Sequence, residues 1–584
     1  MKRSLAALAL GSALALSACG GGQTRVDIFS GPRLDEDAEA LRNLSRKLAG
    51  LAPKGANVAI GVVEGGIVGV DLAGGEPWNF EHALDSRPVV IGTVVVGMGD
   101  GELFALDART GTQLWARRAS GSLRGAGDDG HTTVVSLSSK GENATTILVV
   151  AHDGRVIRQL EAQPVVGTPA IVGPFAFFPW QPKQLTVYDI TSGDEVARLE
   201  LPAPASSAFT LGGAVFVGES SLHRFDDLAE KRFVSVTAPS RTLPGSPAWH
   251  RSGAQPLPVH ADARDMIRLF ARPTASGPLA IEGRTLVGTY LQLAFGLDAE
   301  TGETQWIRTM PSELLGGAAY PGGTALCDAS GTITFVDAFT GNATGSASLG
   351  HKVSSCVVQV DDFARARTPR ETSLAQELTA ALTLGNGELL PMQRELLREL
   401  QDRRDEDFTK TLIDVASSAR TPRALVGEVR AALAARRTGT RHMLEALSRH
   451  YDFLQGEDPP PLGPLAEALA KLGELSAAPL LAEHLLDPAN ASAEIEKVAL
   501  ALVYLATERE LPQLETFFAL HRATADDDAL VGAVAHVARA IVAVAGDEGR
   551  AFVAKGVSDP TTHPAVRAYI TEWLDSAPQA STSP

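Results

Sequence analysis

The distribution of apolar residues divides the chain into two parts with different periods. In the first 360 residues, short apolar runs such as 94–98 and 103–106 alternate with turns rich in Gly and Asp. Short alternating runs between such turns are typical of antiparallel strands. Beyond residue 373, apolar residues recur at helical spacing, as in Leu465, Leu469 and Leu472. The pattern predicts a multidomain protein in which an all-β part precedes an all-α part.

A turn motif recurs through the strand-forming part. An Asp is followed four residues later by a Gly, and in two copies a Trp follows the Gly by four residues. The carboxylate can accept bonds from backbone N–H groups of the turn, and the Gly can adopt positive φ. The Trp can bury its ring between neighbouring sheets. We therefore expect a structural role for Asp71, Gly75, Asp107, Gly111, Trp115, Asp189, Gly193, Asp298, Gly302, Trp306, Asp337 and Gly341.

The spacing of the motif predicts a β-propeller. These five copies, with degraded ones around 151–157 and 219–225, make about seven units over residues 56–361. Units of about 40 residues with four strands each are typical of propeller blades. The Pro-rich region 240–278 is either an insertion or an eighth unit without a recognisable motif. We expect seven four-stranded blades, or eight if this region forms one.

The stretch with Ala105, Asp107, Gly111 and Trp115 resembles the repeat of the PQQ-type, or quinoprotein-like, β-propellers. That family contains periplasmic quinoprotein dehydrogenases and non-enzymatic propellers, among them the BamB type of outer-membrane assembly lipoprotein. The dehydrogenases share adjacent cysteines, a calcium site and an Asp base, but this chain has no Cys-Cys pair and no C-x-x-C-H motif. We therefore expect no catalytic residue, cofactor or metal. The alternative is a PQQ-dependent oxidoreductase, or a small-ligand sensor that uses the propeller channel.

The second part, residues 373–576, is predicted to form paired helices. Pro479 and Pro512 each open a short helix that follows a longer one. Pairs that recur every 30–36 residues or so indicate an α-solenoid, and the stretch 465–481 resembles a HEAT repeat. The alternative is an ordinary helical bundle. The polar segment 362–372 is predicted to be a linker.

One group of residues in the helical part could be either a metal site or a solvated surface. His442 and Glu445 share a predicted helix face, and His450 follows two turns later. We expect the solvated surface, because charged helix faces are usually exposed. The last residues, 577–584, are predicted to be a disordered tail.

The N-terminus has the features of an export signal. Lys2 and Arg3 precede an apolar run over 5–16, which is too short to span a membrane. The sequence that ends at Cys19 resembles a lipobox, so residues 1–18 are predicted to be a signal peptide and Cys19 to carry lipid. In this interpretation, residues 19–55 form the lipidated Cys, a tether and a short helix. The alternative is ordinary cleavage after Ala18, without lipid. No later apolar run is expected to reach membrane-spanning length.

Charge, cysteine content and the residue after Cys19 bear on the binding partners, the cross-links and the location of the protein. Asp and Glu outnumber Lys and Arg by 69 to 52, which disfavours nucleic-acid binding. Cys327 and Cys356 lie about one repeat apart, and they either form a disulfide or stay as two buried thiols. In the lipoproteins that the N-terminus resembles, an Asp directly after the lipidated Cys favours retention at the inner membrane. This chain has Gly20 at that position, so the resemblance implies the periplasmic face of the outer membrane.

These features together predict a non-catalytic, membrane-anchored periplasmic scaffold. Propellers and solenoids both offer large surfaces for protein partners. A BamB-like role in outer-membrane protein assembly is the sharpest form of this hypothesis. BamB-type propellers lack a long helical extension, so the second part departs from that pattern.

Overall fold

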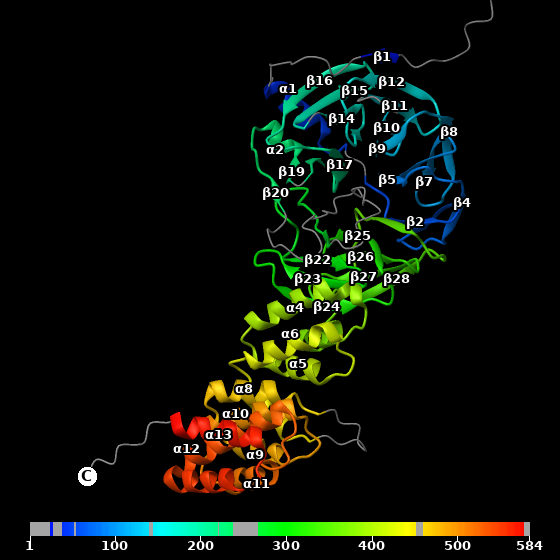
Figure 1. Cartoon of the computed structure of the whole chain (residues 1–584). Coiled ribbons are helices and arrows are strands. Elements are labelled where there is room, and N and C mark those ends of the chain that lie inside the picture. The colour runs from blue at the N-terminus through cyan, green and yellow to red at the C-terminus, as the bar shows by residue number, and fades with distance from the viewer. Residues whose placement is uncertain are drawn as a thin grey trace, which may run out of the picture. The chain divides into compact units, whose positions relative to one another are not determined.

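The structure is a computed structural model that describes residues 24–26, 38–51, 54–138, 144–180, 182–219, 221–237, 267–450 and 459–576. The chain divides into two compact units, residues 1–371 and 372–584. The first consists mainly of strands and the second of helices, which confirms the predicted order of an all-β and an all-α part (Figure 1). The predicted signal peptide, Cys19 and the tail lie outside the described residues.

The described part of the first unit contains seven sheets, each with four antiparallel strands and one of them with a fifth, parallel strand, and we number them blades 1–7. Blade 1 contains β29 (Ser355–Gln359), β2 (Val58–Val63), β3 (Gly66–Asp71) and β4 (Trp78–Glu81). Blade 2 contains β5 (Val89–Ile91), β6 (Val94–Gly99), β7 (Glu102–Asp107) and β8 (Gln113–Arg118). Blade 3 contains β9 (Ser122–Asp128), β10 (Thr132–Ser138), β11 (Thr145–Ala151) and β12 (Val156–Ala162).

The remaining four blades follow the same order of strands. Blade 4 contains β13 (Ala170–Val172), β14 (Phe175–Trp180), β15 (Gln184–Asp189) and β16 (Asp194–Glu200). Blade 5 contains β17 (Ser207–Leu211), β18 (Ala214–Gly218), β19 (Ser221–Arg224) and β20 (Val236–Thr237). Blade 6 contains β21 (Arg268–Phe270), β22 (Thr285–Tyr290), β23 (Leu293–Asp298) and β24 (Thr304–Thr309). Blade 7 contains β25 (Leu314–Tyr320), β26 (Gly323–Asp328), β27 (Thr332–Asp337) and β28 (Ala343–Ser348).

The two ends of the propeller meet in blade 1. β29, the last strand, pairs antiparallel with β2, the first strand of the ring. Gln359 Nε2 donates to the carbonyl oxygens of Ala56 and Gly92, at 2.9 and 2.7 Å. The blades follow one another around the ring in chain order (Figure 1). The described residues thus hold seven sheets, while 238–266, most of the predicted insertion or eighth unit, lies outside them.

Blade 5 departs from the turn pattern expected around 219–225. The short helix α2 (Phe225–Ala229) follows β19 directly, where blades 1, 2, 4, 6 and 7 have an Asp-x-x-x-Gly turn. The helix α1 (Ala38–Leu48) packs on α2 and on blade 4, with Leu41 buried in the same cluster as Phe225. A short helix therefore does lie within residues 19–55, and it covers one side of blades 4 and 5.

The second unit contains eleven described α-helices. They are α3 (Leu374–Leu382), α4 (Leu390–Asp402), α5 (Glu406–Ser417), α6 (Arg423–Ala434), α7 (Thr440–Leu447), α8 (Leu462–Leu472), α9 (Ala478–Leu485), α10 (Ser492–Leu505), α11 (Leu511–His521), α12 (Asp528–Ser558) and α13 (Pro564–Ser576). From α3 to α10, each helix packs against the helix two places later in the chain. Two layers of alternate helices result, which is how stacked helix pairs are arranged.

The helix α12 corrects one expectation from the sequence. It is long and apolar enough to cross a membrane, although we expected no second run of that kind. However, half of its apolar window is buried within the unit, and its backbone breaks at Gly546, with φ 56° and ψ −126°. A helix that is apolar on most sides belongs either to a core or to a membrane. Because α12 packs against α10 and α11, we assign it to the core.

The segment that was predicted to be a linker makes specific contacts with the last two blades. Arg365 lies over the ring of Phe335, 4.0 Å from its centroid. Asn342 Nδ2 donates to the carbonyl oxygen of Pro369, and Arg370 Nη2 donates to that of Gln305 at 2.6 Å. Residues up to 370 are thus held against the propeller before the helical unit begins.

Candidate functional site

The Asp-x-x-x-Gly turns bring the motif residues together as local clamps. In blade 2, Asp107 Oδ1 accepts bonds from the backbone N–H groups of Arg109 and Thr110, at 3.0 and 2.9 Å. Gly111 has a φ of 70°, in the left-handed region. Asp189, Asp298 and Asp337 accept the same pair of backbone bonds, and Gly193, Gly302 and Gly341 are also left-handed. The copy at Asp71 departs from this pattern, because its carboxylate accepts a backbone bond from Ala73, two positions later, and Gly74 rather than Gly75 has positive φ.

The tryptophans join each blade to the next one. Trp306 of blade 6 is fully buried and donates from Nε1 to Ala338 O, in the turn of blade 7, at 2.7 Å. A Cβ added to Gly341 in that turn would lie 2.5 Å from the Trp306 ring, so the turn needs a residue without a side chain. Trp78 makes the equivalent bond to Ala108 O, at 3.3 Å. The motif therefore links blades as well as shaping turns.

Two other junctions between blades lack this hydrogen bond from a tryptophan. Trp115 is buried, but its Nε1 has no hydrogen-bond partner among the described residues. At the next junction Arg158 replaces the tryptophan and donates to Ile190 O and Thr191 O, both at 2.6 Å. The guanidinium thus supplies the same kind of contact where the sequence lacks the aromatic ring.

A disulfide joins Cys327 to Cys356, so the question left open by the sequence has an answer in the structure. Cys327 lies in β26 of blade 7, whereas Cys356 lies in β29 of blade 1. The bond therefore links the last blade to the strand that closes the ring.

Two buried polar junctions between blades were not predicted from the sequence. Asp128 of blade 3 is 1% exposed, and its Oδ2 accepts bonds from the N–H and the hydroxyl of Thr93 of blade 2, both at 3.0 Å. His152 Nε2 lies 2.7 Å from Asp128 Oδ1. Burial lowers the pKa of His152, but the bond to Asp128 and its charge outweigh burial and raise that pKa overall.

The second junction is centred on Asp361, just beyond β29. Its carboxylate accepts bonds from the backbone N–H groups of Gly55 and Gly212, at 2.8 and 2.9 Å. Arg272 Nη2 lies 3.7 Å from the same group. One buried carboxylate thus ties blades 1, 5 and 6. Nothing in the spacing of these four residues along the chain marks them as neighbours.

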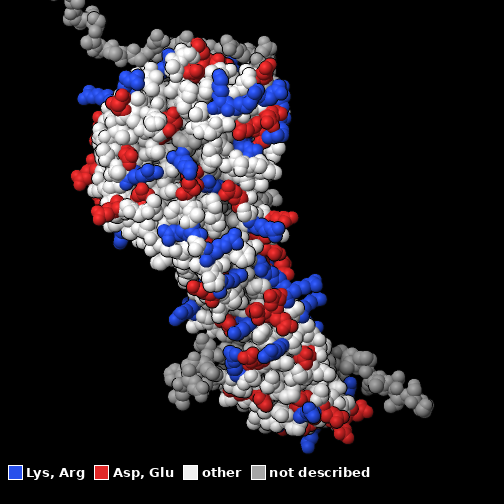
Figure 2. All heavy atoms as spheres, turned by 180° about the vertical axis from the view of Figure 1, so that it is seen from behind, with Lys and Arg blue, Asp and Glu red and all other residues white. Residues whose placement is uncertain are grey.

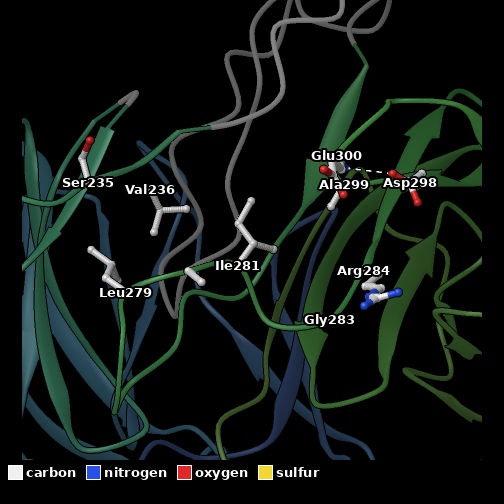
Figure 3. A pocket seen from close by; sticks show the side chains of 10 residues that line it. Ser235, Val236, Leu279, Ile281, Gly283, Arg284, Asp298, Ala299 and Glu300 are labelled. Atoms are coloured by element: carbon white, nitrogen blue, oxygen red, sulfur yellow. Dashed lines mark hydrogen bonds between the residues drawn. The ribbon is translucent and has the colours of Figure 1, made fainter.

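One open cavity of about 470 Å³ lies between blades 5 and 6 (Figure 3). Val236, Leu279 and Ile281 make up its apolar side, and Arg284 and Glu300 belong to its polar side. Asp298 also lines it, but its Oδ1 is bonded to the backbone of Glu300 and Thr301. These bonds lower the pKa of Asp298, so the carboxylate serves the turn in its charged form.

The outer edge of blade 3 shows how this propeller takes up an additional strand. The strand β1 (Thr24–Val26) pairs in parallel with β12, and the partners are Thr24 with Gln159 and Val26 with Glu161. Residues more than 130 positions apart in the chain thus share one ladder. An outer strand presents unpaired N–H and C=O groups that can bind another extended segment.

The histidine group predicted in the helical unit is only partly brought together. His442 Nδ1 lies 4.0 Å from Glu445 Oε2 on α7. His450 lies beyond the end of α7, and its Nδ1 is 3.3 Å from Asp487 Oδ2 after α9. His450 therefore belongs with residues that the sequence analysis did not connect to it.

Charges of both signs are interspersed on the surface. Figure 2 shows Lys and Arg side chains among Asp and Glu side chains over both units, on the face in view. The chain carries a formal net charge of −17. This mixture differs from the basic stripe that nucleic-acid binding requires.

Comparisons with known proteins bear on the propeller. The family described as outer membrane protein assembly factor BamB matches residues 63–221, from the end of β2 to the start of β19. No curated protein matches the chain. The crystal structure of BamB from Moraxella catarrhalis is similar at 16% identity and a TM-score of 0.29, over 51% of this chain and 84% of that one. The computationally designed Ika8 protein is similar at 15% identity and a TM-score of 0.31, over 54% and 92%.

The family match supports a BamB-like β-propeller region. The matched residues lie wholly in the first unit, within blades 1–5. The resemblance of the second unit to HEAT repeats stays a prediction, because the family match does not reach it.

Proposed function

We propose that this protein is a non-catalytic scaffold, held at the periplasmic face of the outer membrane by lipid on Cys19, that binds extended segments of other proteins. The pairing of β1 with β12 carries the proposal, since it is an extended segment already bound to a blade edge. The match to the outer membrane protein assembly factor family supports a role in the assembly of outer-membrane proteins.

The blade edges differ in how far they are already covered. β12 is covered by β1. On β24 the backbone carbonyl oxygen of Gln305 already accepts a hydrogen bond from Arg370. On β28 that of Thr344 accepts one from Arg365 Nη1, at 3.2 Å. β4 and β20 have four and two residues. β16 has seven residues, but the helix α1 packs beside it. β8 has six residues, and no described strand pairs with its outer side, so we propose that a client segment adds to β8.

Cross-linking in cells tests the client edge. A photoreactive amino acid at Gln113, an exposed residue of β8, should cross-link to other proteins when cells are illuminated. The matched control is Phe339, which is 64% exposed but lies in a turn of blade 7. Cross-links from both positions in equal yield, or from neither, would contradict binding at β8.

Membrane fractionation tests the anchor. We expect Cys19→Ala to move the protein from the membrane to the soluble periplasmic fraction, while the native chain stays with outer-membrane markers. A variant that stays in the membrane fraction would contradict the proposed tether. Stoichiometric binding of PQQ with Ca²⁺, together with dye reduction, would contradict the non-catalytic part of the proposal and favour the oxidoreductase.

A further inference from the structure

Three side chains of the helical unit converge between the ends of two helices. His450 follows α7, His484 lies in the last turn of α9, and Asp487 follows α9. One potential ligand atom from each lies within 4.8 Å of the other two. The rings of His450 and His484 have centroids 4.2 Å apart. Two imidazoles and one carboxylate are a ligand set that divalent transition metals bind.

His484 has a free lone pair at this place. The residue is 1% exposed, and its Nε2 lies 2.7 Å from the carbonyl oxygen of Leu447. A carbonyl oxygen only accepts, so Nε2 carries the proton and Nδ1 of the neutral ring is unprotonated. Nδ1 is buried and has no hydrogen-bond partner among the described residues. An unsatisfied buried nitrogen is costly unless something binds it.

The hydrogen bond from Nε2 to Leu447 O fixes the orientation of the His484 ring, as backbone carbonyls commonly do for metal-binding histidines. It leaves Nδ1 as the nitrogen that can bind an ion.

The other two groups are placed to complete a coordination shell. His450 Nδ1 and Asp487 Oδ2 are 3.3 Å apart. Two ligands of a tetrahedral zinc ion with bonds of about 2.0–2.1 Å are separated by roughly 3.3 Å. The backbone N–H of Ala489 donates to Asp487 Oδ1 at 2.9 Å, which orients that carboxylate. The side chain of His450 is 42% exposed, so it can adjust when an ion arrives.

The local electrostatics favour a cation. The C-terminal ends of α7 and α9, with their partial negative charge, both lie at this place. Glu483 Oε2 lies 4.0 Å from His450 Nε2 and adds a further negative charge. The nearest cation in sequence, Arg449, is paired with Glu445 at 3.3 Å.

We propose that His450, His484 and Asp487 bind a divalent transition-metal ion, with Zn²⁺ as the first choice, and that water takes the fourth position. The ion would connect the chain after α7 to the end of α9, two helices that occupy consecutive positions in one layer of the unit. This site is independent of the proposed client edge on β8, and neither depends on the other.

The test uses the full chain, purified in detergent and stripped of metal with a chelator. Titration with ZnCl₂ against a chromophoric competitor should show one tight site per chain. Replacing a ligand should weaken the affinity for Zn²⁺ at least about tenfold, so we expect that loss for His450→Ala and Asp487→Asn. His351→Ala, which removes an exposed histidine of the propeller, is the matched control and should leave the affinity unchanged.

Folding and coordination are checked separately. Because His450 is partly exposed, His450→Ala should keep the far-UV circular dichroism of the native chain, and it decides the test if Asp487→Asn does not fold. Co²⁺ bound to the native chain should show the visible absorption of a tetrahedral site, and His450→Ala should lose it. Absence of a stoichiometric Zn²⁺ site in the native chain, or equal affinity in His450→Ala, would overturn the proposal.

Discussion

Contacts within the propeller and contacts within the helical unit join residues at different separations along the chain. In the propeller, contacts that close the ring join residues about 300 positions apart, such as Gly55 with Asp361 and Ala56 with Gln359. In the helical unit, side chains reach the neighbouring helix pair, as when His484 contacts Leu447, 37 positions away. A ring must close as a whole, whereas a stacked array depends on nearest neighbours. Damage should therefore spread around the propeller but stay local in the array.

The largest effect is expected from removing a blade-joining tryptophan. Trp306→Ala should destabilise the propeller by about 3–5 kcal/mol, because a fully buried ring and its bond to Ala338 are both lost. Phe517→Ala, at a residue of α11 that is 1% exposed, should cost a similar amount. Hydrogen exchange measured by mass spectrometry should rise in all seven blades for the first variant. For the second it should rise only in the helices near α11, and a spread through the whole unit would break the comparison.

The second-largest loss of stability is expected from removal of the disulfide. Cys327 and Cys356 are separated by 29 residues, and a cross-link over a loop of that length is worth roughly 3–4 kcal/mol in the chain-entropy account. The double variant Cys327→Ala/Cys356→Ala should lower the unfolding midpoint of the propeller in a denaturant titration and leave that of the helical unit in place. A reductant should reproduce the shift in the native chain. It should have no effect on the double variant, which serves as the control.

Two glycines with positive φ, one in each unit, differ in whether an added methyl group would contact a neighbouring side chain. Gly473 ends α8 with φ 67°, and an added Cβ would meet nothing within 4 Å. Gly473→Ala should therefore cost about 1–2 kcal/mol, from backbone strain alone. Gly111 has a similar φ, but its Cβ would lie 2.4 Å from the Trp78 ring. Gly111→Ala should cost about 1–3 kcal/mol more, from overpacking, and equal costs by thermal unfolding would contradict the role of close approach.

The smallest effect concerns the junction between blades 2 and 3. The pKa of His152 is raised in the folded protein, so its stabilising contribution is present below its unfolded pKa and is lost as pH rises through the folded value. The ring is partly exposed, and the effect should stay below about 1 kcal/mol. Between about pH 6 and pH 8 the native propeller should lose slightly more stability than His152→Gln does. Parallel pH profiles of the two proteins would contradict this account.

The local motifs could be predicted because each is complete within a few residues. Asp107 bonds the N–H groups two and three positions later, so its spacing from Gly111 already specifies the turn. The partner of a motif residue in another blade could not be predicted in this way. Trp78 lies on Gly111 of the next blade, but the sequence around position 78 does not indicate which glycine it contacts. The prediction that no later apolar run reaches membrane-spanning length was wrong at α12, and only the packing of this helix against α10 and α11 assigns it to a core.

The sequence alone thus determined an all-β part followed by an all-α part, the repeated turn and its structural character, since these depend on periods of two to four residues. Only the tertiary structure decided that β29 closes blade 1, that Cys327 bonds Cys356, and that His450 meets His484 and Asp487. These pairings join residues 29 to about 300 positions apart. Over such distances many partners are open to a chain, and the choice depends on how whole blades and helices pack together.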